Sequence, residues 1–261
     1  MAHSAITERF TKIREENNGK KAFIPYIMAG EPSVSSTVDI VLELEAMGAD
    51  IVELGVPFSD PVADGPTIQR AAMSALARGV TLRKVIEMVK TIRQKSRIPI
   101  VLMTYFNPVL KFGLGNFVDA ALSNGVDGII IPDLPPDEET DFTSSCHRAG
   151  PDTIFLLAPT STDSRIGLVS RQSRGFIYYV SLTGITGAAI AIDESLKSRI
   201  EKIRFISGKP VAVGFGVKTK DEAAAVAAVA DGVIVGSAIV KAIADGQEVF
   251  RALVKSLRAA I

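Results

Sequence analysis

Residues 211–238, VAVGFGVKTKDEAAAVAAVADGVIVGSA, decide the fold class of this chain. The runs at 211–213 and 232–235 are short and rich in β-branched residues, as buried strands are, and residues 220–228 between them have a helical pattern. A strand, a helix and a second strand in this order are typical of a parallel sheet whose faces are covered by helices.

The same alternation extends over most of the 261 residues. Earlier apolar runs, each bounded by Gly, Pro or Asp, lie at 22–29, 50–54, 98–103, 128–131, 153–157 and 176–180. Helical patterns lie at 35–47, 68–77, 82–96, 117–123, 137–148, 164–170, 195–206, 239–244 and 247–260. Eight strands that alternate with helices over about 250 residues predict a (β/α)8 TIM barrel. We expect one domain over residues 1–261, with an extra N-terminal helix and a short helix after the eighth strand.

A doubly wound open sheet is the competing architecture. It would place a G-x-G-x-x-G turn directly after the first strand. Residues 30–33, GEPS, follow the run at 22–29 and lack that pattern, so the barrel is the favoured fold.

Composition excludes several kinds of function. Lys and Arg number 29, as do Asp and Glu, and this balance gives no electrostatic reason to expect nucleic acid or an anionic membrane as a partner. Cys146, His3 and His147 cannot supply a disulfide framework or the four ligands of a Cys/His zinc site, so we expect no metal. The N-terminus has no secretory signal pattern and the apolar runs fall far short of the ~20 residues of a membrane helix. We therefore expect a soluble, cytoplasmic protein.

One carboxylate lies inside the second predicted strand. Strand alternation puts Glu53 on the same face as Ile51 and Gly55. Burial raises the pKa of an unpaired carboxyl group, and a raised pKa suits a general acid or base near neutral pH. A structural ion pair with a basic residue is the alternative, and position alone does not decide between them.

Two more carboxylates follow in residues 56–66, VPFSDPVADGP, a loop that three prolines stiffen. Asp60 and Asp64 are both candidates for the site. Either could instead cap the helix that begins near Pro66.

Glycines at the ends of the last two strands predict a phosphate site. Gly214 and Gly216 follow the seventh strand, and Gly236 and Ser237 follow the eighth and precede a short helix. Glycine lets backbone N–H groups approach a ligand, a helix N-terminus favours an anion, and TIM barrels frequently bind phosphate at this place. Plain turns are the alternative. Residues 183–187, TGITG, could form a further phosphate contact or the hinge of a mobile lid.

Absent residue types narrow the chemistry further. The strand interiors contain no lysine for a Schiff base, and both histidines fall outside the strand ends, where a metal-dependent aldolase would need them. Acid–base cleavage or isomerisation of a phosphorylated substrate remains.

Residues 53–66, 103–108, 133–135, 184–187 and 214–216 resemble signature segments of tryptophan synthase alpha subunits. The match runs in order from about Ile6 to the C-terminus. The resemblance implies a lyase that cleaves indole-3-glycerol phosphate to indole and D-glyceraldehyde 3-phosphate in L-tryptophan biosynthesis. Indole-glycerol-phosphate synthases and sugar-phosphate isomerases are rival barrels, but they would place a lysine or another acid pair at the strand ends.

The resemblance also implies roles for individual residues. Glu53 would be the general acid/base, and Asp64 would accept a hydrogen bond from the indole N–H. The phosphate would be bound by Gly187, Gly216, Gly236 and Ser237, and the lid would include Thr183, Gly184 and Thr186. The indole pocket would be lined by Tyr26, Met103, Tyr105, Ile130, Leu156, Tyr178 and Phe215, for which ordinary barrel core is the alternative.

The family implies a partner as well. The chain would join a beta subunit in an alpha2beta2 heterotetramer and carry no cofactor itself, since the pyridoxal phosphate belongs to the partner. Asp60, Asn107 and Pro108 would lie in the contact surface, within residues 56–66 and 107–113. Residues 188–192, AAIAI, depart from the polar residues of many relatives, which leaves open an alpha-like protein that mainly binds and activates a beta subunit.

Overall fold

A computed structural model describes residues 4–16, 19–138, 140–180, 194–214 and 216–261. Its strands are β1 (Ala22–Met28), β2 (Val52–Gly55), β3 (Ile100–Met103), β4 (Gly128–Ile130), β5 (Asp152–Ile154), β6 (Leu156–Leu157), β7 (Ile177–Val180), β8 (Val211–Gly214) and β9 (Gly232–Val235). Its helices are α1 (Ala5–Glu16), α2 (Val34–Ala46), α3 (Pro66–Ala77), α4 (Leu82–Arg93), α5 (Phe106–Phe112), α6 (Leu114–Ser123), α7 (Thr140–Ala149), α8 (Asp163–Gln172), α9 (Glu194–Ser207), α10 (Lys220–Val229), α11 (Ser237–Asp245) and α12 (Gln247–Arg258).

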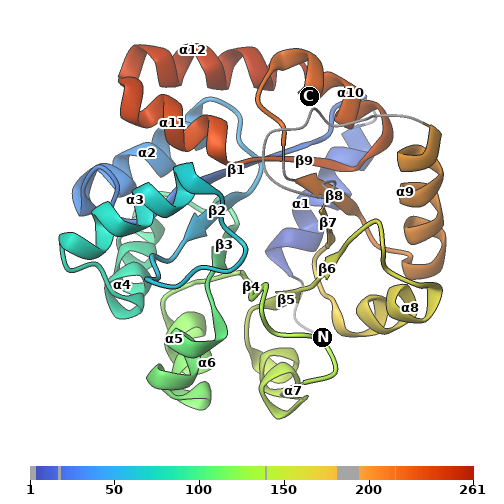
Figure 1. Cartoon of the computed structure of the whole chain (residues 1–261), viewed down its shortest axis with the longest axis horizontal. Coiled ribbons are helices and arrows are strands. Elements are labelled where there is room, and N and C mark those ends of the chain that lie inside the picture. The colour runs from blue at the N-terminus through green and yellow to red at the C-terminus, as the bar shows by residue number, and fades with distance from the viewer. Residues whose placement is uncertain (1–3, 17–18, 139, 181–193, 215) are drawn as a thin grey trace.

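The strands form one parallel sheet in the order β5-β4-β3-β2-β1-β9-β8-β7-β6. The sheet curls into a nearly closed barrel, and the helices surround it (Figure 1). This architecture confirms the predicted (β/α)8 fold. Because the strands are parallel, all their carboxyl ends lie at one end of the barrel, and that end is where polar side chains are expected to meet.

The predicted fifth strand, 153–157, is wrong in one respect, because it is two strands that meet at Phe155. β5 pairs with β4 and β6 pairs with β7, so the chain changes neighbours at this residue. The N–H of Phe155 donates to Ser173 Oγ at 3.3 Å instead of to a strand. An apolar run does not reveal such a change of partner, and the break is the seam of the barrel.

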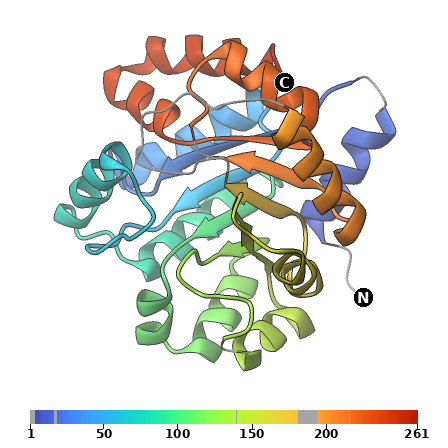
Figure 2. The same ribbon diagram turned by 45° about the vertical axis from the view of Figure 1, so that its right-hand side comes forward.

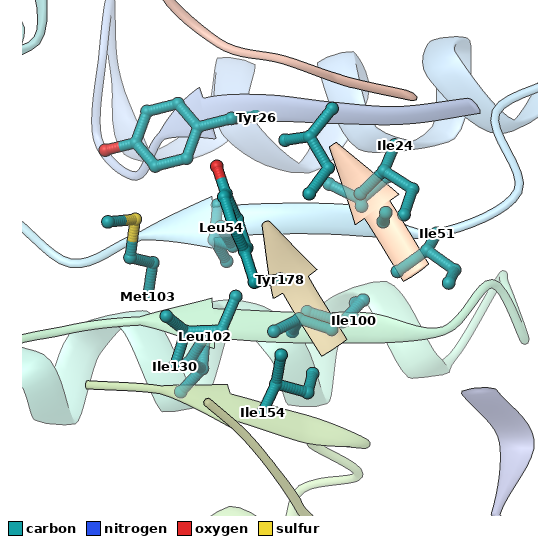
Figure 3. Close-up of a cluster of buried hydrophobic side chains, with 14 of the residues drawn as sticks. Ile24, Tyr26, Ile51, Leu54, Ile100, Leu102, Met103, Ile130, Ile154 and Tyr178 are labelled. Carbon is teal, nitrogen blue, oxygen red and sulfur yellow. The ribbon is translucent and has the colours of Figure 1, made fainter. Parts of the chain in front are cut away.

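The barrel interior is filled by buried apolar side chains. All seven residues of β1 are buried, as a parallel strand covered on both faces requires. In Figure 3, Ile24, Ile51 and Ile100 fill one end of the core, and Tyr26 and Met103 lie at the other. The hydroxyl groups of Tyr26 and Tyr178 point toward the end of the core where Met103 lies.

Helix α1 covers the opposite, N-terminal end of the strands (Figure 2). Ile6 is fully buried there, and a Cβ atom on Gly128 would lie 2.7 Å from its Cδ1 atom. The ring of Phe10 lies 5.7 Å from that of Phe176. The predicted extra N-terminal helix is therefore present and closes the floor of the barrel.

Helix α5 was not expected from the sequence. Its first N–H group, that of Phe106, donates to Asp133 Oδ1 at 2.9 Å, so its cap comes from a residue far along the chain.

Among the described residues, no helix has the length and apolar character needed to cross a membrane.

Candidate functional site

A pocket of about 300 Å³ opens at the carboxyl ends of the strands, and we call it the central pocket. Its walls come from β1, β2, β3, β7, β9, the loop before α3 and the first turn of α3, the loop after β8 and the start of α11. The lining residues are Tyr26, Glu53, Ala63, Asp64, Gly65, Pro66, Thr67, Ile68, Met103, Tyr178, Gly216, Val217, Lys218, Ile234, Gly236 and Ser237. The pocket thus lies where the fold predicts an active site.

Glu53 is the most unusual group in this pocket. It pairs in register with Tyr26 of β1 and Val101 of β3, and its side chain is 1% exposed. Neither carboxylate oxygen has a hydrogen-bond partner among the described residues. Burial, and then the negative charge of Asp64, raise the pKa of Glu53 to about 8. The alternative of a structural ion pair is therefore not supported by the described contacts, and at neutral pH the carboxyl group holds a proton.

Asp64 lies in the loop between β2 and α3. The N-cap of α3 is Gly65 and no side chain makes a capping hydrogen bond there, so neither Asp60 nor Asp64 caps this helix. Burial raises the pKa of Asp64, and the nearby hydroxyl group of Tyr105 opposes that shift.

Tyr105 contacts the loop that carries Asp64 at two points. The N–H of Ala63 donates to its hydroxyl oxygen at 3.1 Å, and its ring lies 5.2 Å from that of Phe58. Gln69 of α3 donates to the backbone oxygen of Asp64 at 2.8 Å. These contacts fix the carboxylate of Asp64 at the rim of the pocket.

Two tyrosine rings form the remaining polar wall. The hydroxyl of Tyr26 lies beside Gly55 and that of Tyr178 beside Gly214, where added Cβ atoms would be 2.1 Å and 2.3 Å from the respective oxygens. Glycine at these two strand ends is what makes room for the tyrosines. Burial, followed by the nearby acidic groups, raises the pKa of both tyrosines well above the usual value, so both hydroxyls stay protonated.

The start of α11 and the loop at Gly216 form a part of the pocket that favours an anion. α11 begins at Ser237 after the N-cap Gly236, so its first N–H groups face the pocket end that also contains Gly216. Gly216 has a φ of 97°, which favours glycine. Helix N-termini carry partial positive charge and attract phosphate groups.

The predicted site residues divide into three groups. The central pocket brings together Tyr26, Glu53, Asp64, Met103, Tyr178, Gly216, Gly236 and Ser237. Tyr105, Ile130 and Leu156 are not among the described lining residues. Thr183, Gly184, Thr186, Gly187 and Phe215 lie outside the described residues. Asp60 and Asn107 are exposed and Pro108 is half-buried.

Lys218 is the charged lining residue that was not predicted from the sequence. It lies two residues after Gly216, in the loop after β8, and a basic residue at this place could have been recognised from the sequence as a candidate phosphate contact.

Among the described residues, no group of three His, Cys, Asp or Glu side chains could hold a metal ion.

The fold and the central pocket define a (β/α)8-barrel enzyme with two acidic side chains at the carboxyl ends of its strands. A family model for "Tryptophan synthase alpha chain" matches residues 10–260. The chain belongs to this family. Its activity is the family's lyase reaction, the cleavage of indole-3-glycerol phosphate in tryptophan biosynthesis.

Individual relatives agree with this assignment. The tryptophan synthase alpha chain of Geobacter sulfurreducens is 51% identical over 91% of this chain and 89% of its own length. That of Geobacter sp. strain M21 is 49% identical over 91% and 88%. Among solved structures, the alpha subunit from Legionella pneumophila is 36% identical with a TM-score of 0.90, covering 100% of this chain and 99% of its own. Tryptophan synthase from M. tuberculosis, in an aminoacrylate-bound form, is 37% identical with a TM-score of 0.89, covering 99% and 100%.

Proposed function

We propose that Glu53 and Asp64 carry the cleavage of indole-3-glycerol phosphate in this chain, with the substrate in the central pocket. The observation that supports this most strongly is the burial of Glu53 without a partner among the described residues, beside a second acidic group. Such a carboxyl group costs several kcal/mol when charged, so its retention inside the barrel calls for a reason other than stability.

The chemical steps follow from the protonation state of Glu53. The protonated carboxyl group transfers its proton to C3 of the indole ring, and the ring nitrogen takes up the positive charge. Asp64 accepts the N–H hydrogen bond and stabilises that charge, so the ring acts as the electron sink that a Schiff base supplies elsewhere. The Glu53 carboxylate then removes the proton of the hydroxyl group next to C3. The carbon–carbon bond breaks, its electrons return to the ring, and indole and glyceraldehyde 3-phosphate leave with Glu53 again protonated.

Binding is assigned to the rest of the pocket. The N–H groups at the start of α11, the Ser237 hydroxyl and the backbone at Gly216 and Gly236 would hold the phosphate. Tyr26, Met103 and Tyr178 would hold the indole ring against the core. Thr183, Gly184, Thr186 and Gly187 stay predicted as lid and phosphate residues, and Phe215, Ile130 and Leu156 as indole contacts.

The assembly is also proposed. We expect a beta subunit as partner in an alpha2beta2 heterotetramer, with pyridoxal phosphate in the partner and none in this chain. Asp60, Asn107 and Pro108 would lie in the contact surface, and residues 1–261 would act as one cytoplasmic domain. Titration of the chain with a fluorescently labelled beta subunit measures the affinity and the stoichiometry.

The direct test is an assay of indole release from indole-3-glycerol phosphate, with and without a beta subunit. Release in both conditions, increased by the beta subunit, is the expected result. No release in either condition would contradict the catalytic proposal. An alpha-like protein that only activates its partner would instead raise the partner's reaction from added indole and form no indole itself.

A further inference from the structure

The central pocket contains one basic side chain among its lining residues. The described lining residues also include Glu53, whose carboxyl group holds a proton at neutral pH, and Asp64. An ionised Asp64 repels a doubly charged anion, and Lys218 is the basic side chain among the described lining residues that can offset this repulsion. The position of Lys218 therefore decides how the pocket can accept a phosphorylated ligand.

Lys218 is fixed at its backbone and open at its side chain. Its N–H donates to Glu222 Oε2 at 2.7 Å, and the N–H of Thr219 donates to the same oxygen at 3.0 Å. Thr219 and Glu222 form a capping box at the start of α10, and Val217 is 2% exposed. The loop that holds Lys218 is thus anchored on both sides, which limits the region that the four-carbon side chain can reach.

The ammonium group is available to a ligand. The side chain of Lys218 is exposed, and it forms no salt bridge with a carboxylate among the described residues. Other lysines, such as Lys197 and Lys202, do form such salt bridges. Glu222, four residues further along the chain, already accepts two backbone N–H groups. A ligand anion would therefore not have to displace an existing carboxylate partner of Lys218 within the described part of the chain.

Charge arithmetic gives the reason for a basic residue here. A phosphate monoester carries about −1.5 to −2 charges near pH 7, whereas a helix N-terminus supplies only about half of a positive charge. Asp64, which also lines the pocket, adds repulsion when it is ionised. Backbone N–H groups at Gly236, Ser237 and Gly216 can orient the phosphate, but they do not balance its charge.

We propose that Lys218 binds the phosphate group of the substrate and sets the preference of this enzyme for phosphorylated over unphosphorylated substrates. This inference rests on the proposed phosphate site and adds a residue to it. Lys218 acts on binding of the ground state and the transition state alike, because the phosphate takes no part in the bond that breaks.

The test is a charge series at Lys218 in the full chain, with a matched control two residues along. Lys218→Gln removes the charge, Lys218→Arg keeps it, and Lys220→Gln removes an equal charge from the exposed first residue of α10, which does not line the pocket. We expect Lys218→Gln to raise KM for indole-3-glycerol phosphate by about three- to tenfold with little change in kcat, as loss of one partly exposed charged contact should. Lys218→Arg should restore most of the affinity, and Lys220→Gln should behave as the parent chain.

Ionic strength provides a second readout. Added salt screens an exposed charge pair, so KM of the parent chain should rise between 0.05 M and 0.5 M salt, and that of Lys218→Gln should rise less. An equal salt dependence in both proteins would overturn the proposal. So would equal losses in Lys218→Gln and Lys220→Gln, because a general loss of positive charge would then be the cause.

Calorimetric binding of glycerol 3-phosphate separates this inference from the proposed activity. If the parent chain forms no indole but binds glycerol 3-phosphate more tightly than Lys218→Gln does, the catalytic proposal fails and the assignment of Lys218 stands. If indole forms but both proteins bind glycerol 3-phosphate equally, the assignment of Lys218 is overturned. Thermal unfolding of each variant, followed by circular dichroism, confirms that the proteins compared are folded.

Discussion

Carboxylates at the two ends of the barrel have opposite environments. At the amino ends of the strands, three aspartates, Asp50, Asp127 and Asp231, each precede a strand. Each accepts a hydrogen bond at 2.7–2.9 Å from an N–H near the start of a neighbouring strand, those of Phe23, Ile100 and Val211 respectively. Each aspartate also forms an ion pair with arginine. Asp50 pairs with Arg9 and Arg258, Asp127 pairs with Arg93, and Asp231 pairs with Arg204. At the carboxyl ends, Glu53 has no such partner among the described residues. The paired carboxylates link adjacent strands, whereas the unpaired Glu53 keeps a proton that is available for acid–base catalysis.

The largest expected effect comes from removing the unpaired acid. Glu53→Gln should lower kcat/KM for indole release by about 10³-fold or more, within the range of general acid–base catalysis, because an amide cannot exchange the proton. The chain should stay folded, since no described contact of the carboxylate is lost. The measurement is the indole assay at saturating and limiting substrate. Glu87→Gln, an exposed acid on α4, is the control, and turnover near the parent rate in Glu53→Gln would remove Glu53 from its role.

Breaking a paired carboxylate should cost stability instead of activity. Asp50→Ala leaves Arg9 and Arg258 without their partner and the N–H of Phe23 without its acceptor. We expect a loss of about 3 kcal/mol in the free energy of unfolding, because one partner of a largely buried pair is removed.

Urea unfolding measures this loss, with the indole assay performed below the transition. Asp60→Ala, at an exposed loop position, should change the free energy of unfolding by no more than about 0.5 kcal/mol. Equal stabilities of Asp50→Ala and Asp60→Ala would show that the amino-end pairs contribute nothing.

The pH dependence of stability should carry the signature of Glu53. Its pKa rises from 4.5 to about 8 on folding, so between these values the folded chain binds more protons than the unfolded chain. Stability from this group is therefore complete below pH 4.5 and falls as pH rises toward 8, by at most about 1.4 kcal/mol per pH unit. Comparison of the parent and Glu53→Gln by urea unfolding from pH 5 to pH 9 isolates the effect. A constant difference between the two proteins over that range would contradict the raised pKa.

The smallest effect concerns the second acidic group. Tyr105→Phe removes the hydroxyl group that counteracts the raised pKa of Asp64, and it leaves the N–H of Ala63 without its acceptor. We expect a loss of about three- to tenfold in kcat/KM, as for one polar contact near a charged group, and a shift of the acidic limb of the pH profile to higher pH. Tyr179→Phe, at a buried tyrosine outside the pocket lining, is the matched control. An unmoved acidic limb would show that Tyr105 does not position Asp64.

The fold and the reactive end of the barrel were largely predictable from the sequence. Short apolar runs gave the strand positions, and alternation within β2 put Glu53 on an inward face. Contacts between distant residues were not predictable. The strand break at Phe155 depends on which neighbour each half pairs with, and the cap of α5 comes from Asp133. The loop that carries Asp64 is held by a hydrogen bond from the Ala63 N–H to Tyr105. Each of these depends on the folded chain bringing together residues that have no pattern in common.

The pairing of β1 with β9 has a consequence for synthesis on the ribosome. Ala22 lies beside Gly232, so the second strand partner of β1 emerges about 200 residues after β1 itself. At about 5–20 residues per second, one edge of β1 waits on the order of 10–40 s for that neighbour. During this interval the nascent chain exposes an unpaired apolar strand edge, the kind of edge that pairs with other chains in aggregation.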